Sequence, residues 1–285
     1  MQATLTEREV LLSDKQYFPK TGSISFENFT NIYMWRTVMH YRLIDANGIR
    51  CLVGHYGNQP DFCFFPRVET DEMLGSVLEE LRRRLGSPLL LRPLDVEAVE
   101  RVKRLYPDAE VIDAPWMHDY IYLQKDLSTL AGNRFHQKRN HVNNFEKKYK
   151  WEYTSVTPDN LHLLRDAAEH LFAVDSRLPD EYEAILDILN HFEELELKAG
   201  ILYVEGVPVA YSIGEVMCPN TALIHIEKGD RSFDGAYAMI NKLFSSEFVD
   251  CTFVNREEDM GIPGLRKAKS SYHPIRMGEY SIVKI

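Results

Sequence analysis

The chain has 285 residues, of which 45% are hydrophobic and 27% charged, a composition typical of a globular protein with one large or two medium domains. Its formal net charge of −10 argues against general coating of nucleic acid. No stretch approaches the roughly 20 apolar residues of a membrane-spanning helix, and residues 1–18 are too charged for a signal peptide, so we expect any membrane contact to be peripheral.

The first half of the chain alternates between strand and helix patterns. Three short apolar stretches between residues 40 and 68 are separated by turn signals and predict three strands. Residues 71–85 and 95–105 have the apolar spacing of helices, with Asp71 as the expected N-cap of the first and Gly86 as its end. Further strands are expected at 88–94, near Val111 and at 119–123.

The middle of the chain reads mainly as helix. We expect a basic helix at 130–150, a strand at 151–156, and helices at 158–172 and 180–197. The last helix has apolar residues at helical spacing, which we expect in the core: Tyr182, Ile185, Leu189, Phe192 and Leu195. We expect a domain boundary near Lys125, giving an N-terminal domain of residues 1–125 and a C-terminal domain of residues 126–285.

The second half repeats the order of the first. The predicted elements are a hairpin at 201–216, a strand at 221–228, a helix at 234–248, a strand at 251–255, a helix at 261–270 and a closing strand at 279–285. Each half therefore has the order β-β-β-α-β-α-β, and only this pattern indicates a repeat. We expect residues 49–122 and 202–283 to share one strand order.

Basic residues gather in two places. Between Arg134 and Lys150 six basic residues stand against a single glutamate, and a second group lies between Arg266 and Arg276. Each cluster alone is typical of a solvated helix face. Together, in an acidic chain, they indicate an anion-binding groove.

The four cysteines form no C-x-x-C pair and no cluster with histidine at metal-ligand spacing. We therefore expect no metal site and no disulfide framework. A reducing cytoplasm is the expected location.

Four segments of the chain carry a family resemblance. They are HDYIYLQKDLSTLAGNRFHQKRNHVNNFEKKY, YVEGVPVAYSIGEV, IEKGDRSFDGAYAMINKLF and VNREEDMGIPGLRKAKSSYHP, and they cover most of residues 119–274. As a set they resemble the DUF2156 group, which is classified with the C-terminal catalytic domain of phosphatidylglycerol lysyltransferase. The order of elements in each half is similar to the GNAT acyltransferase fold, and two such units in one chain resemble the Fem peptidyltransferases. The resemblance implies an α/β (α+β) protein with two tandem GNAT-like acyltransferase domains, each with a central mixed sheet.

The resemblance also implies where an acyl-CoA would bind. GNAT enzymes hold its pyrophosphate on N–H groups at a helix N-terminus, in a loop of the form Q/R-x-x-G-x-G/A. The matching loop runs from Arg231 to Ala236 and has Asp234 in place of the first glycine. Because a carboxylate there repels a pyrophosphate, we expect weak binding of acetyl-CoA or none, and no bound cofactor. Asp234 alone is simply a good N-cap for the following helix.

The resemblance further implies a catalytic centre in the C-terminal half. In the lysyltransferase and Fem families, the lysine of an F-K-x-x-F-x-P-like run faces the aminoacyl-tRNA, and Lys269 matches it within K-S-S-Y-H-P. Lys269 would stabilise an oxyanion and Tyr272 would donate to the leaving group. Glu215 and Glu227 on adjacent strands would bind an acceptor ammonium or act as general base. Without the resemblance, these are a surface lysine, a core tyrosine and two sheet-edge carboxylates paired with arginines.

Substrate-binding residues are expected around this centre. They come from the basic helix, the loop before residue 236, the strands that carry Glu215 and Glu227, and the segments before and within the C-terminal helix. They are Arg139, Lys138, His225, Arg231, Asp234, Asn255, Arg256 and Arg266. His225 shares a strand and a face with Glu227. Glu257 and Asp259 follow the same buried strand as Asn255, where turn and capping chemistry is their simplest role.

We therefore expect an enzyme, an acyltransferase that moves an aminoacyl group from aminoacyl-tRNA to an amine or hydroxyl on a small molecule, a peptide or a lipid headgroup. One alternative is an N-acetyltransferase that uses acetyl-CoA, which Asp234 argues against. The other is a non-catalytic module whose basic groove holds a phosphorylated ligand or RNA. A tRNA is the expected macromolecular partner.

Overall fold

The computed structural model describes residues 24–176 and 179–285, so the expectation that residues 1–18 are not a signal peptide lies outside the described residues. The chain divides into two compact units that are not continuous in sequence. One contains Met1–Asp119, Glu258–Ile262 and Gly278–Ile285, and the other contains Tyr120–Glu257 and Pro263–Met277. The boundary near Lys125 stays a prediction.

The first unit is built on a six-stranded mixed sheet with the order β1-β2-β3-β4-β13-β5. Its strands are β1 (Arg42–Ala46), β2 (Ile49–Gly54), β3 (Phe62–Cys63), β4 (Leu90–Leu94), β5 (Glu110–Asp113) and β13 (Ser281–Lys284). Its helices are η2 (Ser25–Glu27), α2 (Phe29–Trp35), α3 (Asp71–Leu85), α4 (Val96–Leu105) and η3 (Pro115–Met117). Strands β3 and β4 are parallel, whereas β13 is antiparallel to both β4 and β5.

Capping residues explain where the two long helices of this unit begin. The predicted helices at 71–85 and 95–105 are confirmed, but the N-cap of α3 is Thr70, whose hydroxyl accepts from the N–H of Met73 at 3.2 Å. The prediction of Asp71 as this cap is wrong, because its carboxylate is instead paired with Arg101 and Arg104 on α4. Helix α4 begins after Asp95, whose side chain caps it in the usual way.

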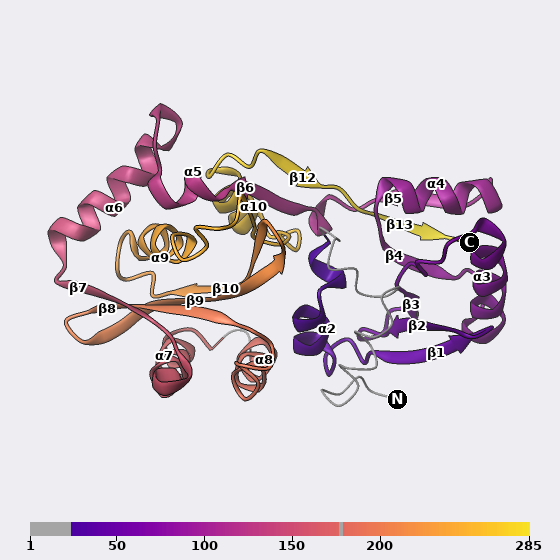
Figure 1. Ribbon diagram of the computed structural model, residues 1–285, viewed down its shortest axis with the longest axis horizontal. Helices are drawn as coiled ribbons and strands as arrows, with labels where there is room; N and C mark the ends of the chain where they lie inside the picture. The colour runs from indigo at the N-terminus through magenta and orange to yellow at the C-terminus, as the bar shows by residue number, and fades with distance from the viewer. Residues whose placement is uncertain (1–23, 177–178) are drawn as a thin grey trace. The chain divides into compact units, whose positions relative to one another are not determined.

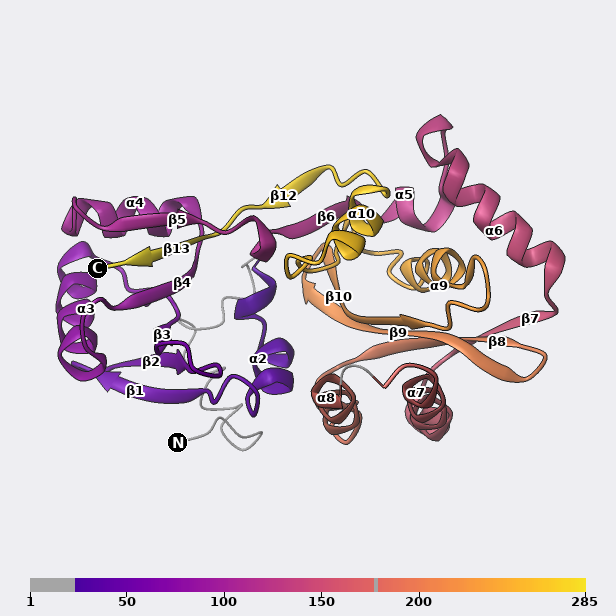
Figure 2. The same ribbon diagram turned by 180° about the vertical axis from the view of Figure 1, so that it is seen from behind.

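The second unit is built on a seven-stranded mixed sheet with the order β12-β6-β11-β10-β9-β8-β7. Its strands are β6 (Asp119–Leu123), β7 (Trp151–Ser155), β8 (Lys198–Val204), β9 (Val207–Cys218), β10 (Thr221–Gly229), β11 (Phe253–Asn255) and β12 (Arg276–Gly278). Its helices are α5 (Gln124–Thr129), η4 (Asn133–Phe135), α6 (His136–Lys148), η5 (Pro158–Asn160), α7 (Leu161–Val174), α8 (Pro179–Leu189), α9 (Ala236–Ser245) and α10 (Pro263–Ser270). Helix α9 lies on one face of this sheet, and α7 and α8 lie on the other (Figures 1 and 2).

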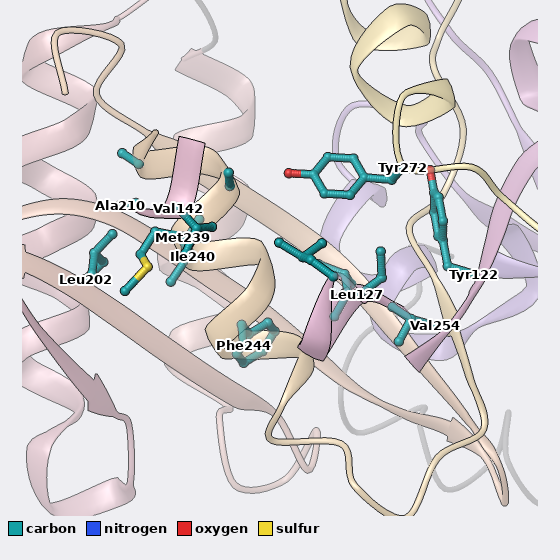
Figure 3. Close-up of a cluster of buried hydrophobic side chains, with 14 of the residues drawn as sticks. Tyr122, Leu127, Val142, Leu202, Ala210, Met239, Ile240, Phe244, Val254 and Tyr272 are labelled. Atoms are coloured by element: carbon teal, nitrogen blue, oxygen red, sulfur yellow. The ribbon is translucent and has the colours of Figure 1, made fainter. Parts of the chain in front are cut away.

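A large apolar core fills the space between α9 and its face of the sheet. Figure 3 shows Met239, Ile240 and Phe244 of α9 within this cluster, with Tyr122 and Tyr272 at the end away from Leu202. Helix α6 joins the same core through Val142 and Phe145. The two tyrosines therefore border both the core and the polar groups described below.

Two predicted helices of this unit have different bounds. The helix expected at 180–197 ends at Leu189, and turns carry Phe192 and Leu195 into the core. Burial is confirmed for Ile185, Leu189, Phe192 and Leu195, but Tyr182 is only half-buried, because its ring stacks on Phe172 near the surface. Helix α9 begins at Ala236 after Gly235 at φ +92°, and no side chain caps it. Asp234 is therefore not the N-cap, because the left-handed Gly235 separates it from the helix.

The two sheets share one strand order and exchange one strand. The order β1-β2-β3-β4-β13-β5 matches β8-β9-β10-β11-β6-β12, which confirms the predicted repeat of strand order. The closing strands were assigned wrongly: β6 completes the second sheet and β13 completes the first. Both are short apolar strands with a neighbour on each side, so their local sequence does not determine which sheet they join.

Candidate active site

The parallel strands β10 and β11 separate at the centre of the second unit. They pair from Thr221 with Phe253 to Leu223 with Asn255, after which β11 ends and β10 continues to Gly229. The C-terminal part of β10 therefore has no ladder partner on this side. Ends of this kind are where ligands bind in many α/β sheets, and here polar side chains occupy the opening.

A β-bulge directs these side chains. Ile224 pairs with Gly214 and Ile226 with Ile213, so His225 is an extra residue in β10. Ile224 packs in the core beneath α9, and the bulge shifts the alternation so that Glu227, three residues later, also meets α9. Without the bulge, Glu227 would lie on the opposite face of the sheet.

His225 lies between two carboxylates. Its Nε2 is 2.9 Å from Glu215 on β9, and its Nδ1 is 3.0 Å from Glu257, which follows β11. Burial lowers the pKa of this imidazole, since only 1% of the side chain is exposed, but the hydrogen bonds and charges of the two glutamates outweigh it and raise the pKa to about 9. His225 is therefore a cation at neutral pH that links β9, β10 and the chain after β11.

Arg256 forms the second charged pair of the opening. Its Nη2 donates to Glu227 Oε1 at 2.8 Å, and Asn241 of α9 donates to the other oxygen, Oε2, at 3.0 Å. The guanidinium carbon lies 4.9 Å from the ring centroid of Tyr272 and 5.6 Å from that of Tyr122. These contacts fix Arg256 in one orientation beside the core.

Two atoms of this group have unused hydrogen-bonding capacity. Arg256 Nη1 and Asn241 Oδ1 are both buried, and neither has a hydrogen-bond partner among the described residues. A buried polar atom without a partner costs about 1–3 kcal/mol. One of these atoms is a donor and the other an acceptor, so the site is incomplete in a way that a ligand with the opposite pair of groups would satisfy.

Lys138 brings a further cation to this place from α6. Its Nζ lies 4.0 Å from the ring centroid of Tyr272. Burial and the charge of Arg256 lower the pKa of Lys138 to about 8, against the opposing effect of Glu227. Nearby, His273 after α10 contacts the carbonyl of Arg134 in η4 at 3.0 Å.

Lys269 holds the backbone of the same region. It is 8% exposed, and its amine donates to the carbonyl oxygen of Arg256. The carbonyl of Lys269 in turn accepts from the hydroxyl of Tyr122 at 2.8 Å. Lys269 is thus not a surface lysine, and its role as an oxyanion stabiliser stays a prediction. Tyr272 is buried and presents its ring to the two cations Arg256 and Lys138.

The structure places seven of the predicted site residues in two groups of this unit. Glu215 contacts His225, and the second group consists of Glu227, Arg256, Lys138, Lys269 and Tyr272. The other five have local or surface positions: Arg139, Arg231, Asp234, Asn255 and Arg266. Arg139 donates to the carbonyls of Leu130 and Gly132 and so holds the turn before α6. For all five of these residues, a role in substrate binding stays a prediction.

Three residues of the site were missed or misread in the sequence. Asn241 lies within an otherwise apolar helix. An asparagine at such a position is itself the signal in the sequence, because a buried amide needs hydrogen-bond partners. Tyr122 belongs to a strand that reads as core. Glu257 was assigned to turn chemistry, yet its carboxylate contacts His225, whereas Asp259 does hold a turn by accepting from the N–H of Gly261.

The N-terminus of α9 is closed by α6. A Cβ atom on Gly235 would lie 2.7 Å from the carbonyl oxygen of His141 and 3.1 Å from Cβ of Phe145. The N–H of Ala236 already donates to the carbonyl of Phe233 at 3.0 Å, and Asp234 lies 3.7 Å from His141. This helix end is therefore packed against protein.

Within residues 24–176 and 179–285, no group of three or more His, Cys, Asp or Glu side chains is arranged to hold a metal ion. Each helix in this part of the chain is too short or too polar to cross a membrane.

Comparison with known families decides the relationship. The model of the family described as "Phosphatidylglycerol lysyltransferase, C-terminal" matches residues 21–283. The chain belongs to this family. The match covers both units of the fold, so the lysyltransferase C-terminal family also includes the part of the chain before residue 119, outside the four segments that carried the resemblance.

Two relatives are between a quarter and a third identical to this chain. An uncharacterized protein of Mycoplasmoides gallisepticum is 26% identical over 197 residues, which span 66% of this chain and 62% of the relative. A crystal structure of a conserved protein of unknown function from Bacteroides thetaiotaomicron is 29% identical, covers 100% of this chain and 98% of its own, and has a TM-score of 0.84. Neither description states an activity.

More distant structures show the fold. L-PGS from Bacillus licheniformis is 14% identical with a TM-score of 0.65, over 99% of this chain and 92% of its own. FemX is 10% identical with a TM-score of 0.64, over 99% and 96%. A tandem GNAT protein from the clavulanic acid biosynthesis pathway is 10% identical with a TM-score of 0.52, over 100% and 97%. The lysyltransferase C-terminal family member described here therefore has the predicted tandem GNAT-like fold.

Proposed function

We propose that the protein is an aminoacyltransferase that moves an aminoacyl group from aminoacyl-tRNA to an amine or hydroxyl acceptor. The observation that carries this proposal is the charged network at the opening between β10 and β11, in a chain whose family is described by a lysyltransferase. Within it, Glu227, Tyr272 and Tyr122 contact the Arg256 guanidinium and hold it in one orientation. Preorganised donors of this kind stabilise the oxyanion of acyl transfer.

The charges of the site suit an ester donor. Arg256 and Lys138 are cations beside the buried ring of Tyr272, and an ester carbonyl gains negative charge when a nucleophile attacks it. Lys138 can exchange a proton near neutral pH because its pKa is lowered to about 8. Glu215 and Glu257 are occupied by the protonated His225, so we assign this trio to positioning rather than to general base catalysis.

We propose further that acetyl-CoA is not a substrate and that no cofactor is required. The loop at Arg231–Ala236 would have to receive the pyrophosphate, but α6 packs against Gly235 and the carboxylate of Asp234 stands beside it. Calorimetry with acetyl-CoA at moderate salt should show no binding at micromolar concentration. Binding there would support the N-acetyltransferase alternative instead.

A charged tRNA would be the partner, and its negative backbone suits the exposed lysines of α6. Since the proposed donor is cytoplasmic, we expect the protein to act there, with an acceptor that is a small molecule, a peptide or a lipid headgroup at a membrane surface.

The test is a transfer assay with total tRNA charged with radiolabelled amino acids. Candidate acceptors are phosphatidylglycerol vesicles, short peptides and amino sugars, and the measurement is label in an acceptor product. We expect transfer by the wild type, a large loss in Lys269→Ala, and no loss in Lys267→Ala, which removes an exposed lysine of the same helix. Absence of transfer to every acceptor, with tRNA still bound, would favour a non-catalytic binding module.

A further inference from the structure

We propose that Arg256 and Asn241 form a subsite for the aminoacyl head of the donor. In this subsite Arg256 Nη1 donates to the ester carbonyl oxygen, and Asn241 Oδ1 accepts from the α-ammonium group. The inference rests on the proposed function and deepens it, because it names the part of the donor that the site recognises. Both atoms are buried and lack a partner among the described residues.

One carboxylate fixes the position of both groups. Glu227 accepts from Arg256 Nη2 through Oε1 and from Asn241 Nδ2 through Oε2. The hydrogen bond from Asn241 Nδ2 also determines the orientation of the Asn241 amide, since a flipped amide would turn its oxygen toward the carboxylate. The second nitrogen of the guanidinium and the oxygen of the amide are then left as a donor and an acceptor on either side of Glu227.

The polarity of this pair identifies the chemical class of the ligand. An α-aminoacyl ester carries a carbonyl oxygen, which accepts, and an α-ammonium group, which donates, on neighbouring carbons. An acetyl group would satisfy Arg256 and leave Asn241 without a donor. A phosphate would suit Arg256 and Lys138 but would bring another acceptor to Asn241 Oδ1. Of these three groups, only the aminoacyl head satisfies both atoms.

Lys138 completes the chemistry of the step. The lone pair of the acceptor attacks the ester carbon, and the carbonyl electrons move to the oxygen held by Arg256. The bond from carbon to the ribose oxygen then breaks, and the ribose oxygen takes a proton from the ammonium of Lys138. Lys138 regains a proton from the attacking atom of the acceptor, so protons and electrons balance. Lys138 suits this part because its amine and the Arg256 guanidinium both lie against the ring of Tyr272.

The experiment compares donors with a free and a blocked α-amino group. Total tRNA charged with labelled amino acids is used as such or after N-acetylation, and kcat/KM for transfer is measured for each. In parallel, the amides of glycine, alanine and lysine and their N-acetyl derivatives are titrated and followed by NMR. We expect the N-acetylated donors to react at least about tenfold more slowly, since they cannot donate to Asn241 from an ammonium. We also expect only the free amides to shift the side-chain signals of Asn241.

Variants separate this inference from the proposed function. Asn241→Leu should slow the free donor and bring the two donors to similar rates, and Ser245→Ala, a buried polar residue one turn further along α9, should keep the discrimination. Equal use of both donors by the wild type would overturn the subsite while the transferase proposal stands. If neither donor reacts, the proposed function fails, and the amide titration alone then decides: binding of the free amides supports the subsite, and no binding overturns it.

Discussion

The parallel strand pairs of the two sheets occupy the same place in the strand order, but they are surrounded by opposite kinds of side chain. In the first unit, β3 and β4 are covered by rings: the Tyr41 centroid is 6.3 Å from Phe62 and 5.7 Å from Phe64. Arg92 lies 3.7 Å over the Phe62 ring, and that ring lies directly on the backbone of Gly54. This opening is filled by its own aromatic residues.

In the second unit, the equivalent opening between β10 and β11 contains paired charges. Glu227 with Arg256, and His225 with Glu215 and Glu257, take the place of the aromatic rings. The difference comes from the length of β10 beyond β11 and from the bulge at His225. A shared strand order is therefore not sufficient for a functional site. The polar residues at the opening of the second unit are what distinguish it from the first.

The largest expected effect separates the arginines of the two openings. Arg256→Gln should lower kcat/KM for aminoacyl transfer by about 10²–10³-fold, because it removes a fixed donor to the developing oxyanion. Arg92→Gln in the first unit changes a residue that contacts an aromatic ring, and transfer by the folded protein should stay within about twofold of the wild type. A similar loss in both variants would contradict the comparison.

The aromatic opening should matter for stability instead. Phe62→Ala removes a buried ring and should lower the free energy of unfolding by about 3–4 kcal/mol, measured by urea denaturation. The ring is packed against a glycine, so the cavity has little room to collapse. The transfer rate per folded molecule should stay unchanged, and a loss as large as that of Arg256→Gln would show that the first unit also takes part in the chemistry.

The charged opening should give stability a pH dependence. The folded-state pKa of His225, about 9, lies above the ordinary 6.5, so its stabilisation is fully present below pH 6.5 and is lost as the pH rises through 9. The difference corresponds to about 3 kcal/mol. His225→Gln should remove this loss of stability between pH 6.5 and 9, whereas His162→Gln, at an exposed position, should retain it. An unchanged pH profile in His225→Gln would mean that the imidazole is not charged in the fold.

The smallest effect concerns the basic surfaces of the two units. Lys147 and Lys150 are exposed at the end of α6 and after it, and reversing either charge should reduce the slope of log affinity for tRNA against log salt by up to roughly 0.7–0.9. Arg83 on α3 is also exposed, but it is paired with Glu80, so Arg83→Glu should leave the slope unchanged. Equal responses would indicate general attraction rather than a tRNA surface on the second unit.

Much of the fold could be predicted from local sequence. Apolar spacing and end signals located α3, α4 and the hairpin at Glu205 and Gly206, because these elements depend on residues a few positions apart. The exchange of β6 and β13 could not be predicted, since DYIYL and SIVK are both apolar strands and their partners are distant in sequence. Asp71 was misjudged as a cap because its ion pairs with α4 involve residues about thirty positions away.

The site was predicted in part for the same reason. Glu215, His225 and Glu227 were found because they lie on two adjacent strands, but the prediction that His225 and Glu227 share a face is wrong, because the bulge at His225 turns Glu227 toward α9. Arg256 was found because it follows a strand end. The resemblance supplied Lys269, but its contact with the carbonyl of Arg256 depends on the packing of α10. The bulge that directs Glu227 toward Asn241 has no clear local signal, so the partner of that carboxylate could only be seen in three dimensions.

The exchanged strands also affect the order of events on the ribosome. In the first sheet β5 is an edge strand whose neighbour is β13, so that edge cannot form until the chain has been synthesised as far as Ser281. Domains of growing chains generally fold one after another from the N-terminus. Here the strands of the second sheet, from β6 to β12, are all translated before β13. The first sheet therefore cannot be completed before every strand of the second sheet has been synthesised, although synthesis of the first unit begins earlier.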